Sequence, residues 1–198
     1  PNVRLLVADD VGLGKTIEAG LILSEMLARG RVRKVVIITP ANLREQWQET
    51  LSYLFHLDTV ILSNQTARKW QRELPAGSSP WEYFDRLIVS VDYAKTVEHR
   101  VHLLNAIDAG TMVIVDEAHI AGKPHQTSAR HKVEMARWEL VRRVAEKAPH
   151  LLLLTATPHN GYSDSFASLI RMVADDAVLG EAHNPHINRR MARRHVCQ

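Results

Sequence analysis

The chain has 198 residues, of which 45% are hydrophobic and 24% charged, and its formal net charge is +3. This length and content allow one substantial hydrophobic core and leave too little chain for two full domains. Residues 186–198 contribute four arginines and no acidic residue, which leaves the rest of the chain at −1. The basic character is therefore local, and this argues against a surface evenly coated for nucleic-acid binding. Segment 186–198 is either a solvated helix face or an interaction segment.

The cysteine content and the apolar runs indicate the compartment. Cys197 is the only cysteine, so an internal disulfide is excluded and a reducing compartment fits best. No stretch resembles a cleavable signal, and apolar runs such as Leu151–Leu154 are far shorter than the ~20 residues that span a membrane. The histidines show no metal-ligand spacing, so no zinc site is expected. We expect a soluble, cytoplasmic protein without a membrane partner.

Short apolar runs alternate with segments of helical period along the chain. In chain order the predicted elements are strand Val3–Ala8, helix Thr16–Arg29, strand Lys34–Thr39, helix Leu43–Leu54, strand Leu57–Leu62, loop Leu74–Pro80, strand Arg86–Ser90, helix Val97–Ile107, strand Met112–Val115, loop Ala121–Pro124, helix Arg130–Lys147 and strand His150–Leu154. This alternation predicts an α/β domain with a mostly parallel central sheet and helices on both faces. Ligands of such domains lie beyond the carboxyl ends of the strands.

The first predicted strand is followed by D-D-V-G-L-G-K-T, residues 9–16. Gly12 and Gly14 allow a tight turn whose N–H groups point at phosphate oxygens, while Lys15 and Thr16 suit the terminal phosphates and a magnesium ion. Asp9 stands where the generic phosphate loop has glycine. The alternative is a glycine turn before a surface helix.

A second motif, Asp116-Glu117-Ala118-His119, ends the predicted strand Met112–Val115. Two adjacent carboxylates at this place suit the metal and the water of a hydrolytic site. Alone, such a pair is also typical of a helix start, where carboxylates cap free N–H groups.

Three further strand ends carry a hydroxyl side chain. Leu151–Leu154 is followed by T-A-T-P, the strand Lys34–Thr39 ends at Thr39 and is followed by P-A-N-L-R-E-Q-W, and Ile88-Val89 is followed by S-V-D-Y. A Thr-Pro turn that merely ends a strand is the alternative for the first. Leu43 and Trp47, four residues apart in the second, are expected to pack in the core.

Together these segments resemble motifs I, Ia, Ib, II and III of the superfamily-two helicases of the Swi/Snf-like branch. Asp10 replaces the Glu that is usual in motif I of this branch. The long forms of motifs I and III look most like the RapA-like group and the helicases of DISARM-type phage defence, which are prokaryotic. The resemblance implies a RecA-like three-layer sandwich that forms the first motor lobe over residues 1–198, with 186–198 as the start of a basic connector toward a missing second lobe.

The resemblance also implies the roles of individual residues. ATP binding falls to Asp10, Gly12, Leu13, Gly14, Lys15, Thr16 and Ile17. Magnesium ligation falls to Thr16 and Asp116, and catalysis to Glu117, which activates water, and Lys15. Coupling of hydrolysis to movement falls to His119, Thr155 and Thr157. Contact with the nucleic-acid backbone falls to Thr39, Pro40 and Ser90.

These features predict the ATP-binding lobe of a nucleic-acid-dependent ATPase, a translocase or helicase that uses ATP and Mg²⁺. Expected partners are nucleic acid, with DNA favoured over RNA, a second RecA-like lobe and a larger protein complex. The isolated chain is expected to hydrolyse ATP barely, because the arginine that relatives supply from the second lobe is absent. The alternatives are a catalytically silent nucleotide-binding scaffold or regulatory module, and, ranked last, a phosphotransferase.

Overall fold

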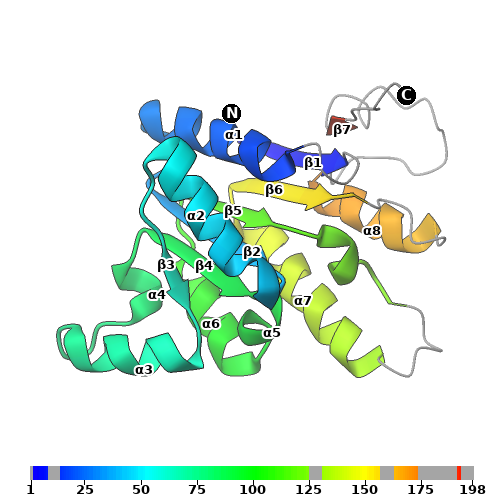
Figure 1. The fold of residues 1–198 in the computed structure, drawn as a ribbon. Coiled ribbons are helices and arrows are strands. Elements are labelled where there is room, and N and C mark those ends of the chain that lie inside the picture. The colour runs from blue at the N-terminus through cyan, green and yellow to red at the C-terminus, as the bar shows by residue number, and fades with distance from the viewer. Residues whose placement is uncertain (1, 9–13, 125–130, 157–162, 174–190, 193–198) are drawn as a thin grey trace.

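The computed structural model describes residues 2–8, 14–124, 131–156, 163–173 and 191–192. Within them, the strands form one sheet in the order β3-β4-β2-β5-β6-β1-β7 (Figure 1). Their bounds are β1 Arg4–Ala8, β2 Lys34–Thr39, β3 Val60–Leu62, β4 Arg86–Ser90, β5 Thr111–Val115, β6 His150–Thr155 and β7 Met191–Ala192. Each of these neighbouring pairs is parallel. The predicted α/β class is confirmed.

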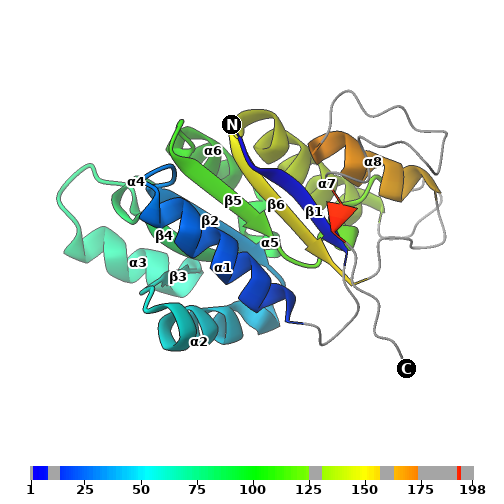
Figure 2. The same ribbon diagram turned by 90° about the horizontal axis from the view of Figure 1, so that it is seen from above.

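Helices cover both faces of this sheet (Figures 1 and 2). Their bounds are α1 Lys15–Ala28, α2 Arg44–Phe55, α3 Asn64–Glu73, α4 Pro80–Tyr83, α5 Val91–Ala94, α6 Val97–Ala106, α7 His131–Lys147 and α8 Ser163–Val173, with short 3₁₀ turns η1 Ala41–Leu43 and η2 Ala118–Ala121. On one face, α1 and α2 contribute Leu23, Trp47 and Leu51 to a buried cluster. On the other, α4 to α8 and η2 contribute to a second cluster. The predicted three-layer sandwich is confirmed.

The central strands are buried along their whole length, and this explains their uninterrupted apolar sequences. In β2, Val36 and Ile38 belong to one core cluster, and Val35 and Ile37 to the other. A strand that alternates between two apolar cores needs no polar face. The continuous apolar sequence of β2 therefore indicates burial on both faces, and the helices on each face provide that burial.

Strand β3 differs from its predicted bounds. The prediction Leu57–Leu62 is three residues too long at its start, because α2 extends further than expected. His56 takes a left-handed conformation, φ 53°, and the backbone N–H of Leu57 donates to the carbonyl of Leu51 at 3.1 Å. Leu57 is therefore tied to the end of α2 and is not available to the sheet.

In the basic segment 186–198, the structure describes only β7, which pairs parallel with β1 at Leu6 and Val7. This part of the segment is a strand, not the helix face that was one alternative. Within the described residues, every helix is too short or too polar to cross a membrane.

His150, at the start of β6, makes the stability of the chain depend on pH. The backbone N–H of Val3 donates to Nδ1 of His150 at 3.0 Å, so this nitrogen must be unprotonated. Burial lowers the pKa of His150 below its ordinary value of 6.5, and the positive charge of Arg31 acts in the same direction. The unfolded chain therefore binds the proton more readily than the folded chain does.

We expect the stabilisation from neutral His150 to be present above pH 6.5 and to be lost as the pH falls from there through the lowered pKa. Urea unfolding at pH 7.5 and 5.5 measures the effect. In His150→Asn, part of the pH dependence of the unfolding free energy should disappear. In His102→Asn, a change at an exposed position on α6, the full pH dependence of the unfolding free energy should persist. An unchanged pH dependence in His150→Asn would contradict the assignment.

Candidate active site

Five neighbouring strands of the sheet end at the sequence motifs. In the order β4-β2-β5-β6-β1, their last residues are Ser90, Thr39, Val115, Thr155 and Ala8. The parallel register places these ends at one edge of the sheet. Only β6 separates β1 from β5, so the segments that leave these two strands start about 10 Å apart, two strand spacings. Figure 2 shows β5, β6 and β1 side by side.

The start of α1 has the geometry that an anion requires. Gly14 adopts φ 80° and ψ 33°, a left-handed conformation that strains any residue with a Cβ atom. Its carbonyl accepts the first helical hydrogen bonds, from Ile17 and Glu18, and its lack of a side chain leaves the helix start without a side-chain cap. Such a start offers backbone N–H donors to a phosphate.

The other predicted ATP-binding residues divide into two groups. Lys15 and Thr16 are half-buried in the first turn of α1, and Ile17 is exposed. Asp10, Gly12 and Leu13 lie outside the described residues.

Asp116 is buried directly after β5, and both of its carboxylate oxygens accept hydrogen bonds. Oδ2 accepts from the indole Nε1 of Trp47 at 2.8 Å and from Oγ1 of Thr39 at 3.4 Å. Oδ1 accepts from the backbone N–H of Glu117 at 2.8 Å. The backbone N–H of Asp116 donates to the carbonyl of Ile38 at 2.8 Å. The carboxylate is therefore fixed by β2, α2 and its own turn.

Glu117, His119 and Thr155 form a connected group beside Asp116. Glu117 adopts a left-handed backbone, φ 49° and ψ 44°, which is uncommon for a residue with a side chain. Its Oε2 lies 3.1 Å from Nδ1 of His119, and the same nitrogen lies 3.2 Å from Oγ1 of Thr155. With Glu117 ionised, Nδ1 of His119 carries the hydrogen, because two acceptors would repel each other.

Two of the three residues to which the resemblance assigns coupling, His119 and Thr155, are thus in contact, and Thr155 is the last residue of β6. Thr157 lies outside the described residues.

The residues predicted to touch nucleic acid are placed differently from the expectation. Thr39 is fully buried, and its hydroxyl donates to Asp116. Ser90 is 5% exposed, and its Oγ accepts from the backbone N–H of Tyr93 at 3.1 Å, which caps α5. Only Pro40 is partly exposed. The hydroxyls of Thr39 and Ser90 are therefore engaged in hydrogen bonds within the fold, which the sequence did not predict.

Comparison with known proteins decides the family. A sequence profile of the SNF2-related domain matches residues 2–183. The chain belongs to the SNF2-related domain family. This domain is 34% identical over 170 residues to the RNA polymerase-associated protein RapA of Proteus mirabilis (strain HI4320), which covers 85% of this chain and 16% of that protein. RapA of Yersinia pestis (strain Pestoides F) is 31% identical over 173 residues, covering 87% and 17%. The chain thus spans about a sixth of the length of these curated relatives.

Solved structures share the fold of this SNF2-related domain. The Sulfolobus solfataricus SWI2/SNF2 ATPase core in complex with dsDNA matches with a TM-score of 0.69 and 16% identity, over 97% of this chain and 40% of that one. The Pyrococcus furiosus Hef helicase domain matches with a TM-score of 0.65 and 18% identity, over 98% and 35%. The RecA-like fold and the place in the Swi/Snf-like branch as a first lobe are confirmed, whereas the DISARM-type relation remains a prediction.

Two side-chain contacts of residues in or beside the motifs of the SNF2-related domain were not predicted. Trp47 was expected only to pack in the core, yet its indole N–H binds Asp116. A buried tryptophan usually needs a partner for this group, and that requirement was the available signal. Asp92, in the S-V-D-Y turn, forms a bidentate pair with Arg137 of α7 and a further pair with Lys95. Burial raises the pKa of Asp92, but hydrogen bonds from Lys95 and Arg137 outweigh it and hold the pKa below its ordinary value.

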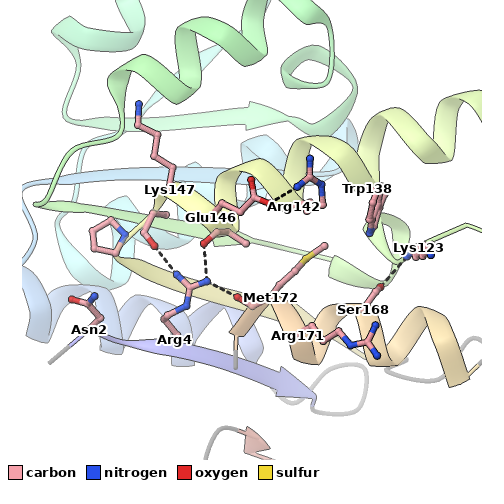
Figure 3. Close-up of a pocket in the computed structure, with 13 residues that line it drawn as sticks. Asn2, Arg4, Lys123, Trp138, Arg142, Glu146, Lys147, Ser168, Arg171 and Met172 are labelled. Atoms are coloured by element: carbon pink, nitrogen blue, oxygen red, sulfur yellow. Dashed lines mark hydrogen bonds and ion pairs between the residues drawn. The ribbon is translucent and has the colours of Figure 1, made fainter. Parts of the chain in front are cut away.

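At the opposite end of β1 from the motifs, the SNF2-related domain has a pocket of about 740 Å³ between α7 and α8 (Figure 3). Arg4, from the start of β1, lines this pocket. The guanidinium donates to the carbonyls of Ala148 and Ala145, each at 2.7 Å, and to that of Met172. Trp138 also lines the pocket, and its buried Nε1 has no hydrogen-bond partner among the residues that the structure describes. Arg4 therefore joins the ends of α7 and α8 to β1.

Proposed function

We propose that this SNF2-related domain is the ATP-binding first lobe of a nucleic-acid-dependent ATPase that moves along DNA. The observation that carries the proposal is the position of Asp116 and Glu117. They follow the end of β5, and β1, the strand that precedes α1 in the chain, ends at the same edge of the sheet, separated from β5 only by β6. A phosphate-binding helix start after one strand and a pair of carboxylates after a strand so near it suit the two ends of a bound triphosphate.

The residues present fit Mg²⁺ and ATP. Asp116 is buried, and within the described part of the chain its Oδ1 accepts only one hydrogen bond, so this oxygen retains acceptor capacity for a cation or its bound water. Thr16 supplies a hydroxyl in the first turn of α1, and Lys15 supplies a cation there. Bound Mg²⁺ would neutralise phosphate charge during the reaction.

The side chains of this chain then have separate roles in the proposal. Lys15 and the N–H groups at the start of α1 hold the phosphates. Glu117 orients a water molecule and accepts its proton, and the contact with His119 holds the Glu117 carboxylate in place. His119 in turn reaches Thr155 at the end of β6, so a change at Glu117 is passed to the neighbouring strand. This contact is the proposed route from hydrolysis to movement.

The relatives support nucleic acid as the partner and favour duplex DNA. The Sulfolobus solfataricus ATPase core was solved with dsDNA, and RapA is named for its association with RNA polymerase. A larger complex follows as part of the proposal. The partly exposed Pro40 turn, between β2 and η1, is the proposed place of contact with the phosphate backbone.

ATP turnover of the full-length protein, measured without nucleic acid and with duplex DNA, single-stranded DNA or RNA, tests the proposal. We expect duplex DNA to stimulate most. Dominant stimulation by single strands would indicate strand separation. Nucleotide binding without turnover under every condition would overturn the proposal in favour of a silent regulatory module. The 198-residue chain alone is expected to turn over ATP barely, since an arginine supplied across the site contributes ~10³–10⁵-fold in well-studied nucleotide hydrolases.

A further inference from the structure

The hydrogen bonds on Asp116 divide its two oxygens into different classes. Oδ2 has two donors, Trp47 and Thr39, which fill its two lone pairs. Oδ1 has one donor, the backbone N–H of Glu117. The carboxylate is thus held with one oxygen saturated and the other open to one more partner.

We propose that Trp47 is a positioning residue that holds Asp116 so that Oδ1 is the oxygen offered to the metal. The inference rests on the proposed function, because it assumes that Asp116 binds Mg²⁺. The contact between Trp47 and Asp116 is a short hydrogen bond to an ionised group inside a buried environment, where such bonds are strongest. The bond from Thr39 is longer, at 3.4 Å, and contributes less.

Packing alone does not account for Trp47. The residue is 1% exposed and belongs to the core cluster under α1 and α2, so its ring certainly fills space. Leu51, one turn further along α2, is as deeply buried in the same cluster, and its aliphatic side chain fills space without any polar group. An aromatic ring without an N–H would fill most of the space of Trp47 but would leave Oδ2 with the weak bond from Thr39 only. The N–H group is therefore the part of Trp47 that acts on Asp116.

The same segment of chain supplies both donors. Thr39 is the last residue of β2, and Trp47 lies in the first turns of α2, so the β2–α2 connection encloses the carboxylate from one side. Pro40, the proposed contact with nucleic acid, lies within this connection. A shift of the connection therefore moves the donors of Asp116 without passing through His119 and Thr155.

The test is Trp47→Phe in the full-length protein, with binding of a fluorescent non-hydrolysable ATP analogue measured against Mg²⁺ concentration. We expect the Mg²⁺ concentration for half-maximal binding to rise about 10-fold, the lower end of the range for groups that orient metal ligands. Binding of the nucleotide without Mg²⁺ should stay unchanged, because Trp47 contacts the carboxylate and not the helix start. Thr39→Val removes the weaker bond and should shift the Mg²⁺ dependence in the same direction by less.

Two control variants separate positioning from packing. Trp138→Phe is the matched change at an indole whose N–H has no partner, and it should leave the Mg²⁺ dependence at the wild-type value. Leu51→Ala destabilises α2 without touching Asp116, and it should lower the melting temperature but not shift the Mg²⁺ dependence. If Leu51→Ala shifts the Mg²⁺ dependence as much as Trp47→Phe does, Trp47 acts only through packing and the inference is overturned.

The outcomes also distinguish this inference from the proposed function. Wild-type protein without Mg²⁺-dependent nucleotide binding would refute the proposed function itself. Wild-type protein with such binding, together with an unshifted Trp47→Phe, would refute only the role of Trp47. If Trp47→Phe fails to fold, the smaller shift expected for Thr39→Val becomes the test, since this change is nearly isosteric. An unchanged Mg²⁺ dependence in that variant would then refute the claim that the donors to Oδ2 determine which oxygen is offered to the metal.

Discussion

Glu117→Gln in the full-length protein is expected to lower nucleic-acid-stimulated ATP turnover by about 10²–10⁴-fold, the usual contribution of a general base. Glutamine keeps the size of the side chain and can still accept from Nδ1 of His119, so the local geometry survives. It cannot accept a proton from water. Binding of ATP should remain close to wild type, because Glu117 takes no part in the helix start that holds the phosphates.

A steady-state ATPase assay with saturating DNA, combined with a nucleotide-binding measurement, checks this prediction. Glu45→Gln is the matched control, since Glu45 lies exposed at the start of α2 and pairs only loosely with Arg44 at 3.8 Å. The control should retain wild-type turnover. Near-normal turnover in Glu117→Gln would remove the basis for assigning hydrolysis to this carboxylate.

Arg4→Ala is expected to destabilise the fold by about 3 kcal/mol, the scale for part-buried acceptors that lose a charged donor. The guanidinium satisfies carbonyls in the last turns of α7 and α8 and in the connection to β6 (Figure 3). Its positive charge also lies at two helix C-termini, where cations are favoured. Arg4→Lys should recover only part of the loss, because an ammonium lacks the planar fork that reaches several acceptors at once.

Urea unfolding of the chain monitored by circular dichroism gives the free energies. Arg29→Ala is the control, since Arg29 is exposed and pairs with Glu25 four residues earlier on α1. A surface pair of this kind contributes at most about 1 kcal/mol. Equal losses of unfolding free energy in Arg4→Ala and Arg29→Ala would show that the carbonyl contacts of Arg4 stabilise the fold no more than an exposed ion pair does.

The strands and their motifs were predictable because each one is specified by a short stretch of consecutive residues. The bounds of β2 and β4 agree with the prediction, since a strand buried on both faces has a nearly continuous apolar sequence. The parallel direction follows from alternation with helices, and it places the motif residues at one edge of the sheet. The pairing of His119 with Thr155 was therefore predictable from two motifs 36 residues apart.

Several helices were not predicted, because their apolar content is low or their length is short. Helix α3 has only Ala67 and Trp70 packed against the core, too few for a periodic pattern. Its signal is the capping box in which Ser63 and Thr66 exchange side-chain and backbone hydrogen bonds. Helices α4 and α5 have four residues each and start at serine caps. For such elements the cap, not the periodicity, is the usable signal.

The contacts of Trp47 and Arg4 could not be predicted from spacing. Trp47 lies 69 residues from Asp116, and Arg4 lies 144 residues from Ala148. A hydrogen bond over such a separation depends on which strands become neighbours, and the strand order is a property of the whole sheet. Physical chemistry supplies only the general rule that an indole N–H or a guanidinium taken out of water requires a partner.

The pairing of β7 with β1 has a consequence for association between molecules. Without β7, β1 would be an edge strand with unpaired amide and carbonyl groups, a template for strand addition by another chain. The backbone of Met191–Ala192 pairs with this edge at Leu6 and Val7. The opposite edge strand, β3, is only three residues long, too short to template an extended intermolecular ladder. The two edge strands of the described sheet, β3 and β7, are thus both short, which disfavours edge-to-edge aggregation.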